Sequence, residues 1–159
     1  MLKKFDHFDC KFVSTPFDPN VRMYSNTSRV VSQLEYARVI GYLMYAMTSA
    51  RPNITFVVKK MSQYMSNPSL LHSQEVYRIQ KYLKGTVNYG IHYSSYPLVL
   101  EGFTDSSWIT NREDHASISG WIFTLGGGVI SWGSKKQTCI ADSTITTKFI
   151  ALASCSKKA

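Results

Sequence analysis

The hydrophobic pattern of this 159-residue chain changes its period once, and that change limits the folds open to it. Before Gly85, apolar residues recur at three- and four-residue steps, which predicts amphipathic helices. After Gly85, apolar and polar residues alternate, which predicts strands, until a last helical run from Ser143 to Ala153. The sequence therefore predicts an α+β fold, in which an N-terminal helical segment precedes a β-sheet with one packed helix.

Turn and cap residues divide the chain into three predicted segments. Residues 1–28 are rich in Asp, Pro, Ser and Thr and are predicted to form an extended lead-in. Residues 29–97 form the helical segment, and residues 98–159 form the sheet segment. The helical segment opens at Ser32 of the capping box Ser-Gln-Leu-Glu, because Glu35 follows the serine by three residues.

Three helices are predicted in the helical segment. The first presents an apolar face of Leu34, Ala37, Ile40, Met44 and Met47. It ends at Arg51-Pro52, after which Asn53 caps a second helix that stops before Asn67-Pro68. The third helix is expected over about residues 71–83, with Gly85 as its C-terminal stop.

The sheet segment and the residues just before it show the strand pattern. Strands are predicted at Tyr89–Tyr93, Leu98–Phe103, Ile118–Leu125 and Val129–Trp132. The three glycines 126–128 separate two strands, so they predict a hairpin turn with positive φ instead of a phosphate-binding loop. The final helix is expected to bury Ile145, Phe149, Leu152 and Cys155.

Several classes of protein are disfavoured by the sequence. No apolar run approaches the roughly 20 residues of a membrane span, and the N-terminus lacks the apolar core of a signal peptide. We therefore expect no membrane partner and an intracellular location, in cytoplasm or nucleus, for a whole protein or a piece of a larger one. Cys10, Cys139 and Cys155 are too far apart for a zinc knuckle and predict reduced thiols, and isolated histidines such as His7 predict no metal site.

Positive charge is concentrated in the middle of the chain, whose formal net charge is +8. Residues 51–90 contain six basic residues and one acidic residue, a net charge of +5. Such a segment is equally consistent with a surface for a polyanion and with solvated helices. The candidate nucleic-acid-binding residues are Arg51, Lys59, Lys60, Lys81 and Lys84, together with Lys135 and Lys136.

A single carboxylate is the best candidate for catalysis. The stretch from Gly102 to Trp108 is typical of a strand end that delivers Asp105 into a polar turn. A metal-dependent nuclease needs further carboxylates beside it, because two divalent ions share anionic ligands. The final helix is the natural source of a second carboxylate, but it carries Lys148. Asp105 alone is therefore a weak candidate metal ligand.

The ordered motifs of the chain resemble the C-terminal part of the Pol polyprotein of copia-type retrotransposons, over nearly its whole length. In the helical segment these are the stretches 33–45, 50–54, 82–86 and 88–90. In the sheet segment they are 100–105 (Leu-Glu-Gly-Phe-Thr-Asp), 117–121 (Ser-Ile-Ser-Gly-Trp), 125–128, 130–138 (Ile-Ser-Trp-Gly-Ser-Lys-Lys-Gln-Thr) and 149–152.

The resemblance implies that the helical segment is the tail of a reverse transcriptase, and that an RNase H-like domain begins near residue 98. An RNase H cleaves the RNA strand of an RNA–DNA hybrid with two Mg²⁺ ions held by four acidic residues. Asp105 matches the first of these, and Lys148 stands where the metal-binding glutamate is expected. Thr146 replaces a second glutamate of the pattern, and the other acidic residues are expected beyond residue 159.

The resemblance thus predicts a truncated, degenerate Pol fragment without nuclease activity, in which Asp105 is vestigial and no Mg²⁺ binds. We also expect self-association through an incomplete fold. Two alternatives remain open at this stage. One is a non-enzymatic, basic nucleic-acid-binding module. The other is a nuclease that obtains its missing carboxylates from a second chain.

Overall fold

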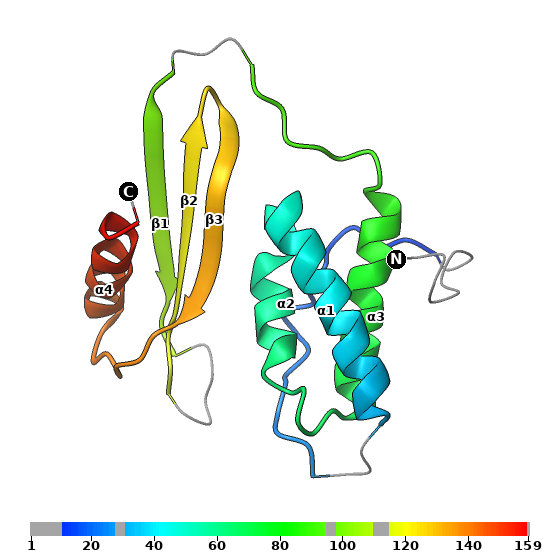
Figure 1. Ribbon diagram of the computed structural model, residues 1–159. Helices are drawn as coiled ribbons and strands as arrows, with labels where there is room; N and C mark the ends of the chain where they lie inside the picture. Colours follow the sequence, from blue (N-terminus) through cyan, green and yellow to red (C-terminus); the bar gives the residue numbers. More distant parts are fainter. Residues whose placement is uncertain (1–10, 28–30, 95–97, 110–114, 159) are drawn as a thin grey trace. The chain divides into compact units, whose positions relative to one another are not determined.

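The computed structural model describes residues 11–27, 31–94, 98–109 and 115–158 (Figure 1). The chain divides into two compact units, Met1–Gly90 and Ile91–Ala159. Among the described residues, the first unit contains helices and the second contains three strands and one helix, so the predicted α+β class is confirmed. Cys10 and His7 lie outside the described residues, as do residues 95–97 before the sheet.

The described part of the first unit contains three α-helices and a short 3₁₀-helix around one apolar core. Their bounds are α1 (Gln33–Ser49), η2 (Pro52–Ile54), α2 (Thr55–Ser62) and α3 (Leu70–Gly85). The core includes Ile40, Leu43, Ile54, Val58, Met61 and Ile79, each fully buried. The hydroxyl of Tyr36 on α1 donates a hydrogen bond of 3.0 Å to the carbonyl of Met61 on α2, so a polar contact joins the helices within the core.

Local capping chemistry explains where these helices begin and end. The Ser32 side chain accepts a hydrogen bond from the Glu35 backbone, which confirms the predicted N-cap of α1. Helix α3 is capped by Ser69, whose hydroxyl accepts from the His72 backbone while the His72 ring accepts from the Ser69 backbone. Leu34 was predicted to be buried, but it is 71% exposed, because α1 turns its Ile40 and Leu43 side toward the core.

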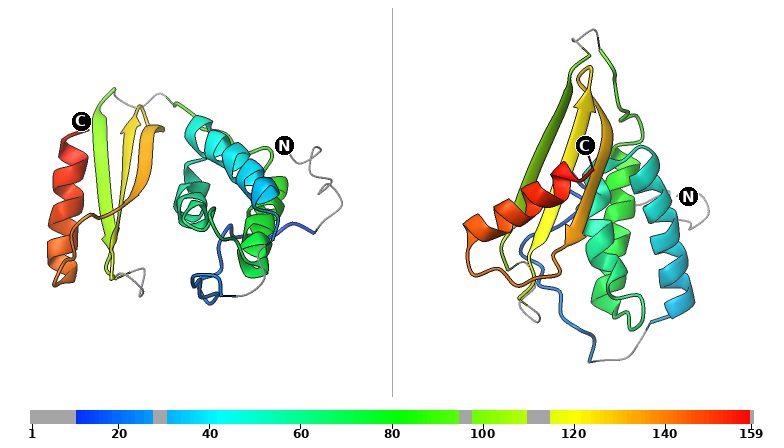
Figure 2. Two further views of the ribbon diagram at one scale, coloured as in Figure 1. Left: turned by 60° about the horizontal axis from the view of Figure 1, so that its bottom comes forward. Right: turned by 60° about the vertical axis from the view of Figure 1, so that its left-hand side comes forward.

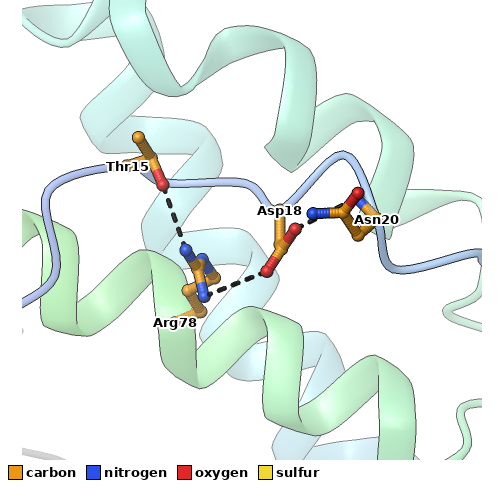
Figure 3. Close-up of polar contacts among 4 residues, drawn as sticks. All are labelled: Thr15, Asp18, Asn20 and Arg78. Atoms are coloured by element: carbon orange, nitrogen blue, oxygen red, sulfur yellow. Dashed lines mark hydrogen bonds and ion pairs between the residues drawn. The ribbon is translucent and has the colours of Figure 1, made fainter.

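Residues 11–27 contain no helix or strand, yet they pack onto the helical unit. Met23 is part of the core, and Phe17 packs against it. Arg78 on α3 donates a hydrogen bond of 3.0 Å to the Thr15 hydroxyl and lies 3.8 Å from the Asp18 carboxylate (Figure 3). This arginine therefore fixes the segment to α3 at two points.

The second unit contains an antiparallel sheet in the order β1-β2-β3. The strands are β1 (Leu100–Ser107), β2 (Ile118–Leu125) and β3 (Gly128–Lys136). Gly126 and Gly127 have φ of 57° and 76°, which confirms the predicted hairpin turn. The predicted strand Tyr89–Tyr93 is wrong, because these residues are irregular, and β1 extends to Ser107 so that Asp105 lies inside the strand.

Helix α4 (Thr144–Ser156) lies against one face of this sheet (Figure 2). Its buried residues are Thr147, Ala151 and Cys155. The predicted apolar face is wrong except for Cys155, because Ile145, Phe149 and Leu152 are 66%, 66% and 54% exposed. The helix approaches the sheet through small side chains, which permit close contact, and it leaves its large apolar side chains on the outside.

Candidate functional site

Asp105 and Lys148 lie on elements that contact each other, but their side chains point to different places. Ser106, the neighbour of Asp105, donates a hydrogen bond of 3.1 Å to Thr147, the neighbour of Lys148. Ser106 therefore faces α4, and the alternation of side chains along a strand places Asp105 on the opposite face of the sheet. Asp105 and Lys148 are both exposed, and within the described part of the chain no ion pair joins them.

The end of β1 is tied to the segment that leads into α4. The indole nitrogen of Trp108 donates a hydrogen bond of 3.1 Å to the carbonyl of Ala141. Near the helix start, the Thr146 hydroxyl donates to the Asp142 carboxylate over 2.7 Å. The resemblance predicts a glutamate at the position of Thr146, and the threonine there makes a hydrogen bond typical of a helix N-terminus instead.

The described residues do not fit a site for two Mg²⁺ ions. Residues 11–27, 31–94, 98–109 and 115–158 contain no group of three or more His, Cys, Asp or Glu side chains able to hold a metal ion. Asp105 is paired across the sheet with Gly120, which offers no side chain. A lone exposed carboxylate on this face cannot supply the shared anionic ligands that two divalent ions require.

Three of the predicted nucleic-acid-binding residues have partners inside the helical unit. The Arg51 guanidinium donates to the carbonyl of Thr86 and, over 3.3 Å, to the Thr86 hydroxyl. The Lys60 ammonium lies 4.7 Å from the centre of the Phe17 ring, and the Lys81 ammonium lies 4.4 Å from the Tyr77 ring. These contacts give each of the three cations a role in the fold.

The remaining predicted cations are placed differently. Lys59 on α2 and the pair Lys135 and Lys136 at the end of β3 are exposed, and Lys84 near the end of α3 is half-buried. Lys59 and Lys84 lie in the first unit and Lys135 and Lys136 in the second. Binding of nucleic acid by these residues stays a prediction.

Burial changes the ionisation of a pair of charged groups in the helical unit. Burial raises the pKa of the Glu75 carboxyl, and the nearby Arg78 and Lys60 oppose this rise while Asp18 adds to it. Burial lowers the pKa of the Lys60 ammonium, an effect that Glu75 opposes. One carboxyl oxygen of Glu75 is buried without a hydrogen-bond partner in the described structure. Glu75 is therefore a destabilising feature of the fold at neutral pH.

The sequence reasoning missed a pocket in the second unit. It has a volume of about 310 Å³ and lies between β2, β3 and α4. Its lining joins the predicted Lys135 and Lys136 to Lys157 and Lys158, which follow α4. The adjacent lysines at the end of a predicted helix were the signal available in the sequence.

Among the described residues, no helix has the length and apolarity to cross a membrane.

Two relatives are transposon proteins. The chain is 32% identical over 158 residues to the retrovirus-related Pol polyprotein from transposon TNT 1-94 of Nicotiana tabacum, with 95% of this chain and 12% of that protein covered. It is 33% identical over 161 residues to the corresponding polyprotein from transposon RE1 of Arabidopsis thaliana, with 99% and 11% covered. The chain thus spans about one tenth of the length of these relatives.

A third relative is much shorter. The secreted RxLR effector protein 161 of Plasmopara viticola is 33% identical over 130 residues, which cover 81% of this chain and 92% of that protein. No family model and no solved structure matches the chain.

Proposed function

The chain belongs to the family of retrovirus-related Pol polyproteins of copia-type transposons, and we propose that residues 98–159 are an RNase H-like segment without nuclease activity. The observation that carries this proposal is the placement of Asp105 and Lys148. The strand residue that could hold a metal is on the sheet face away from α4, and the helix residue expected to assist it is a cation.

The loss of a carboxylate ligand supports the proposed loss of activity. A lysine in place of a glutamate on α4 removes an anionic ligand and adds a cation. Lys148 is exposed and lies on the α4 side of the sheet, so solvent screens its charge from Asp105. Asp105 is thereby left without the shared anionic ligands that two divalent ions need.

Cleavage of a labelled RNA–DNA hybrid in the presence of Mg²⁺ tests the proposal. We expect no cleavage by the unchanged chain or by Lys148→Glu, because the new carboxylate would lie on the α4 side of the sheet while Asp105 lies on the other. An active RNase H on the same substrate is the positive control. Cleavage by the unchanged chain that Asp105→Asn abolishes would overturn the proposal.

A second candidate function is non-enzymatic binding of nucleic acid. Its support is the exposure of three basic side chains, Lys59, Lys135 and Lys136, of the kind that contacts phosphate groups. Binding of this kind weakens steeply with salt, because each neutralised phosphate releases counterions. The test measures the affinity for an RNA–DNA hybrid at increasing salt concentrations. No binding at low salt, or an affinity that does not change with salt, would rule this function out.

A further inference from the structure

One short sequence pattern occurs in both units of the chain: two adjacent lysines, any residue, and then a serine or threonine. The two copies are residues 59–62 (Lys-Lys-Met-Ser) and 135–138 (Lys-Lys-Gln-Thr). Basic residues two and three positions before a hydroxyl form a charge pattern that a protein kinase with an acidic substrate cleft can select. The two copies are equivalent in sequence, but the structure gives them different access.

Ser62 is withheld by the fold. It is the last residue of helix α2 and is half-buried. Its hydroxyl donates a hydrogen bond of 2.8 Å to the carbonyl of Lys59. Met61, directly before it, is fully buried in the core of the helical unit. A kinase that binds its substrate in an extended form would have to unwind the end of α2 and expose this methionine, which costs free energy of local unfolding.

Thr138 is accessible without unfolding of a helix or strand. It lies in the irregular segment 137–143, which connects β3 to α4. Thr138 and the two residues that follow it are exposed, and Ile140 is exposed to 75%. The structure therefore favours Thr138 over Ser62 as an acceptor for an enzyme that reads this pattern.

Thr138 also lines a pocket whose charge suits a phosphate group. The pocket has a volume of about 310 Å³, and Lys135, Lys157 and Lys158 line it with Thr138. None of the described residues that line it is acidic. The Lys158 ammonium lies 5.0 Å from the centre of the Trp121 ring, which is part of the same lining. Three positive charges without an acidic residue between them favour an anion at this place.

The two lysines at the end of β3 have different roles, because they point to opposite faces of the sheet. Lys135 is paired with Ser119, whose hydroxyl accepts from the Gln137 amide on the α4 side. The alternation of side chains along a strand therefore directs Lys136 to the other face. Lys135 is available to a kinase and to the pocket, whereas Lys136 contributes to recognition alone.

We propose that Thr138 is phosphorylated by a protein kinase that selects preceding basic residues, and that the lysines of the pocket hold the phosphate. The Thr138 oxygen bonds to the terminal phosphorus of a nucleoside triphosphate, the bond from that phosphorus to the bridging oxygen breaks, and the diphosphate leaves. The hydroxyl proton is released. The product carries close to two negative charges and three acceptor oxygens for the ammonium groups. The partial charge of about −0.5 at the C-terminus of α4 opposes this phosphate, but three full positive charges outweigh it.

The first measurement is phosphate transfer to the full chain from ATP by the catalytic subunit of the cyclic-AMP-dependent protein kinase, with the modified residue assigned by mass spectrometry. Two unfolded peptides, residues 56–65 and 132–141, measure the preference of the kinase itself. The ratio of the rate at Thr138 to the rate at Ser62 should be at least about tenfold higher in the folded chain than in the peptides. Lys136→Ala should slow modification of Thr138 about tenfold, since it removes one charge-assisted contact with the kinase.

The second measurement is a ³¹P NMR titration of the modified chain. The second pKa of a phosphothreonine is ordinarily about 6, and nearby ammonium groups should lower this pKa because they favour the dianion. The modified peptide 132–141 gives the reference value without the pocket. Lys157→Ala with Lys158→Ala should return the pKa to that of the peptide without slowing the modification. Lys59→Ala, at an exposed lysine of the other unit, is the matched control and should leave the pKa unchanged.

The two measurements test the two halves of the proposal separately. Selective modification of Thr138 in the folded chain, with a phosphate pKa below that of the peptide, supports both halves. Absence of modification, modification of other residues in place of Thr138, or equal ratios in chain and peptides overturns the assignment of the site. A phosphate pKa equal to that of the peptide, or unaffected by the change of Lys157 and Lys158, overturns the role of the pocket. Neither half depends on the loss of nuclease activity.

Discussion

The hydroxyl of Ser106 donates a hydrogen bond to the hydroxyl of Thr147 over 3.1 Å. Thr147, which is fully buried, also donates to the carbonyl of Thr144 over 2.7 Å, and its own carbonyl accepts from Gln137. A single threonine therefore connects β1, α4 and the segment that follows β3. The sheet–helix packing depends on polar contacts at its centre.

Replacement of Thr147 by valine tests the weight of this connection. The change preserves shape but removes both hydroxyl contacts, and it leaves the half-buried Ser106 hydroxyl without its acceptor. We expect the free energy of unfolding to fall by about 1–2 kcal/mol, measured by urea denaturation. Thr144→Val, at an exposed position of the same helix, should change it by less than about 0.5 kcal/mol. Equal effects of the two changes would contradict this account.

Arg51→Ala should destabilise the helical unit. The guanidinium donates to the carbonyl at the C-terminus of α3 and to the Thr86 side chain, and hydrogen bonds from a charged donor are strong. We expect a loss of about 1.5–3 kcal/mol in thermal or urea unfolding followed by circular dichroism. Lys59→Ala, which removes an exposed cation, is the control and should have little effect. An Arg51→Ala variant with unchanged stability would show that these hydrogen bonds do not contribute to the free energy of unfolding.

Acid should destabilise the helical unit through His72. Burial lowers the pKa of its ring below the ordinary value of 6.5, although a hydrogen bond with the Tyr24 carbonyl opposes this. The ring nitrogen that accepts from Ser69 loses that hydrogen bond on protonation. The unfolded chain binds the proton more tightly, so stability is complete above about pH 6.5 and falls as the pH drops through the folded pKa.

The check is the free energy of unfolding measured between about pH 7.5 and pH 5 for the unchanged chain and for His72→Gln. The variant should be less stable at neutral pH and should lose less stability on acidification. His92→Gln, at an exposed histidine, is the control. A variant that keeps the full acid dependence would assign the effect to other groups.

Two glycines should respond to alanine in opposite ways. Gly41 is in α1 with nothing within 4 Å of an added Cβ, so Gly41→Ala should raise stability by about 0.5–1 kcal/mol. Gly133→Ala would drive a methyl group into the Trp121 ring and should cost about 1–3 kcal/mol. Urea unfolding of the two variants and of the unchanged chain checks both expected values. Stabilisation by Gly133→Ala would contradict the packing of Trp121 on this glycine.

The outer face of α4 predicts association between copies of the chain. Ile145, Phe149 and Leu152 form an exposed apolar stripe on one helix. We expect the mass measured by sedimentation velocity to rise with protein concentration, and Phe149→Lys to suppress the rise. Lys148→Glu is the matched control, since it changes charge beside the stripe without changing the stripe. A monomer at all concentrations would contradict the prediction.

The local parts of the fold could be predicted from sequence because their causes are local. The Ser32 cap, the stop at Gly85 and the Gly126-Gly127 turn each depend on a few adjacent residues. The apolar face of α4 could not be assigned, since periodicity shows that a helix has such a face but not which element covers it. Here the close approach of β1 selected the stripe containing Thr147 and Ala151.

The same limit applies to the candidate site. The motif pattern placed Asp105 on a strand and Lys148 on a helix, as observed. It could not predict that the Asp105 side chain would lie on the sheet face away from that helix. The pocket needs the sheet register and the end of α4 together, because Lys135 and Lys157 are distant in the chain. Gln137 gave no signal in the sequence, because its side-chain hydrogen bonds to Ser119 and Thr147 form only once the sheet and α4 are in place.

The position of Lys148 also bears on how the sequence could have changed. Its side chain is exposed and does not belong to the buried stripe of α4, so the helix packs equally well with either charge at this position. Lysine and glutamate codons differ by a single first-position base. If the position held the glutamate that the resemblance predicts, one point mutation would replace it without any cost in folding, and selection for a stable protein would not have opposed the change.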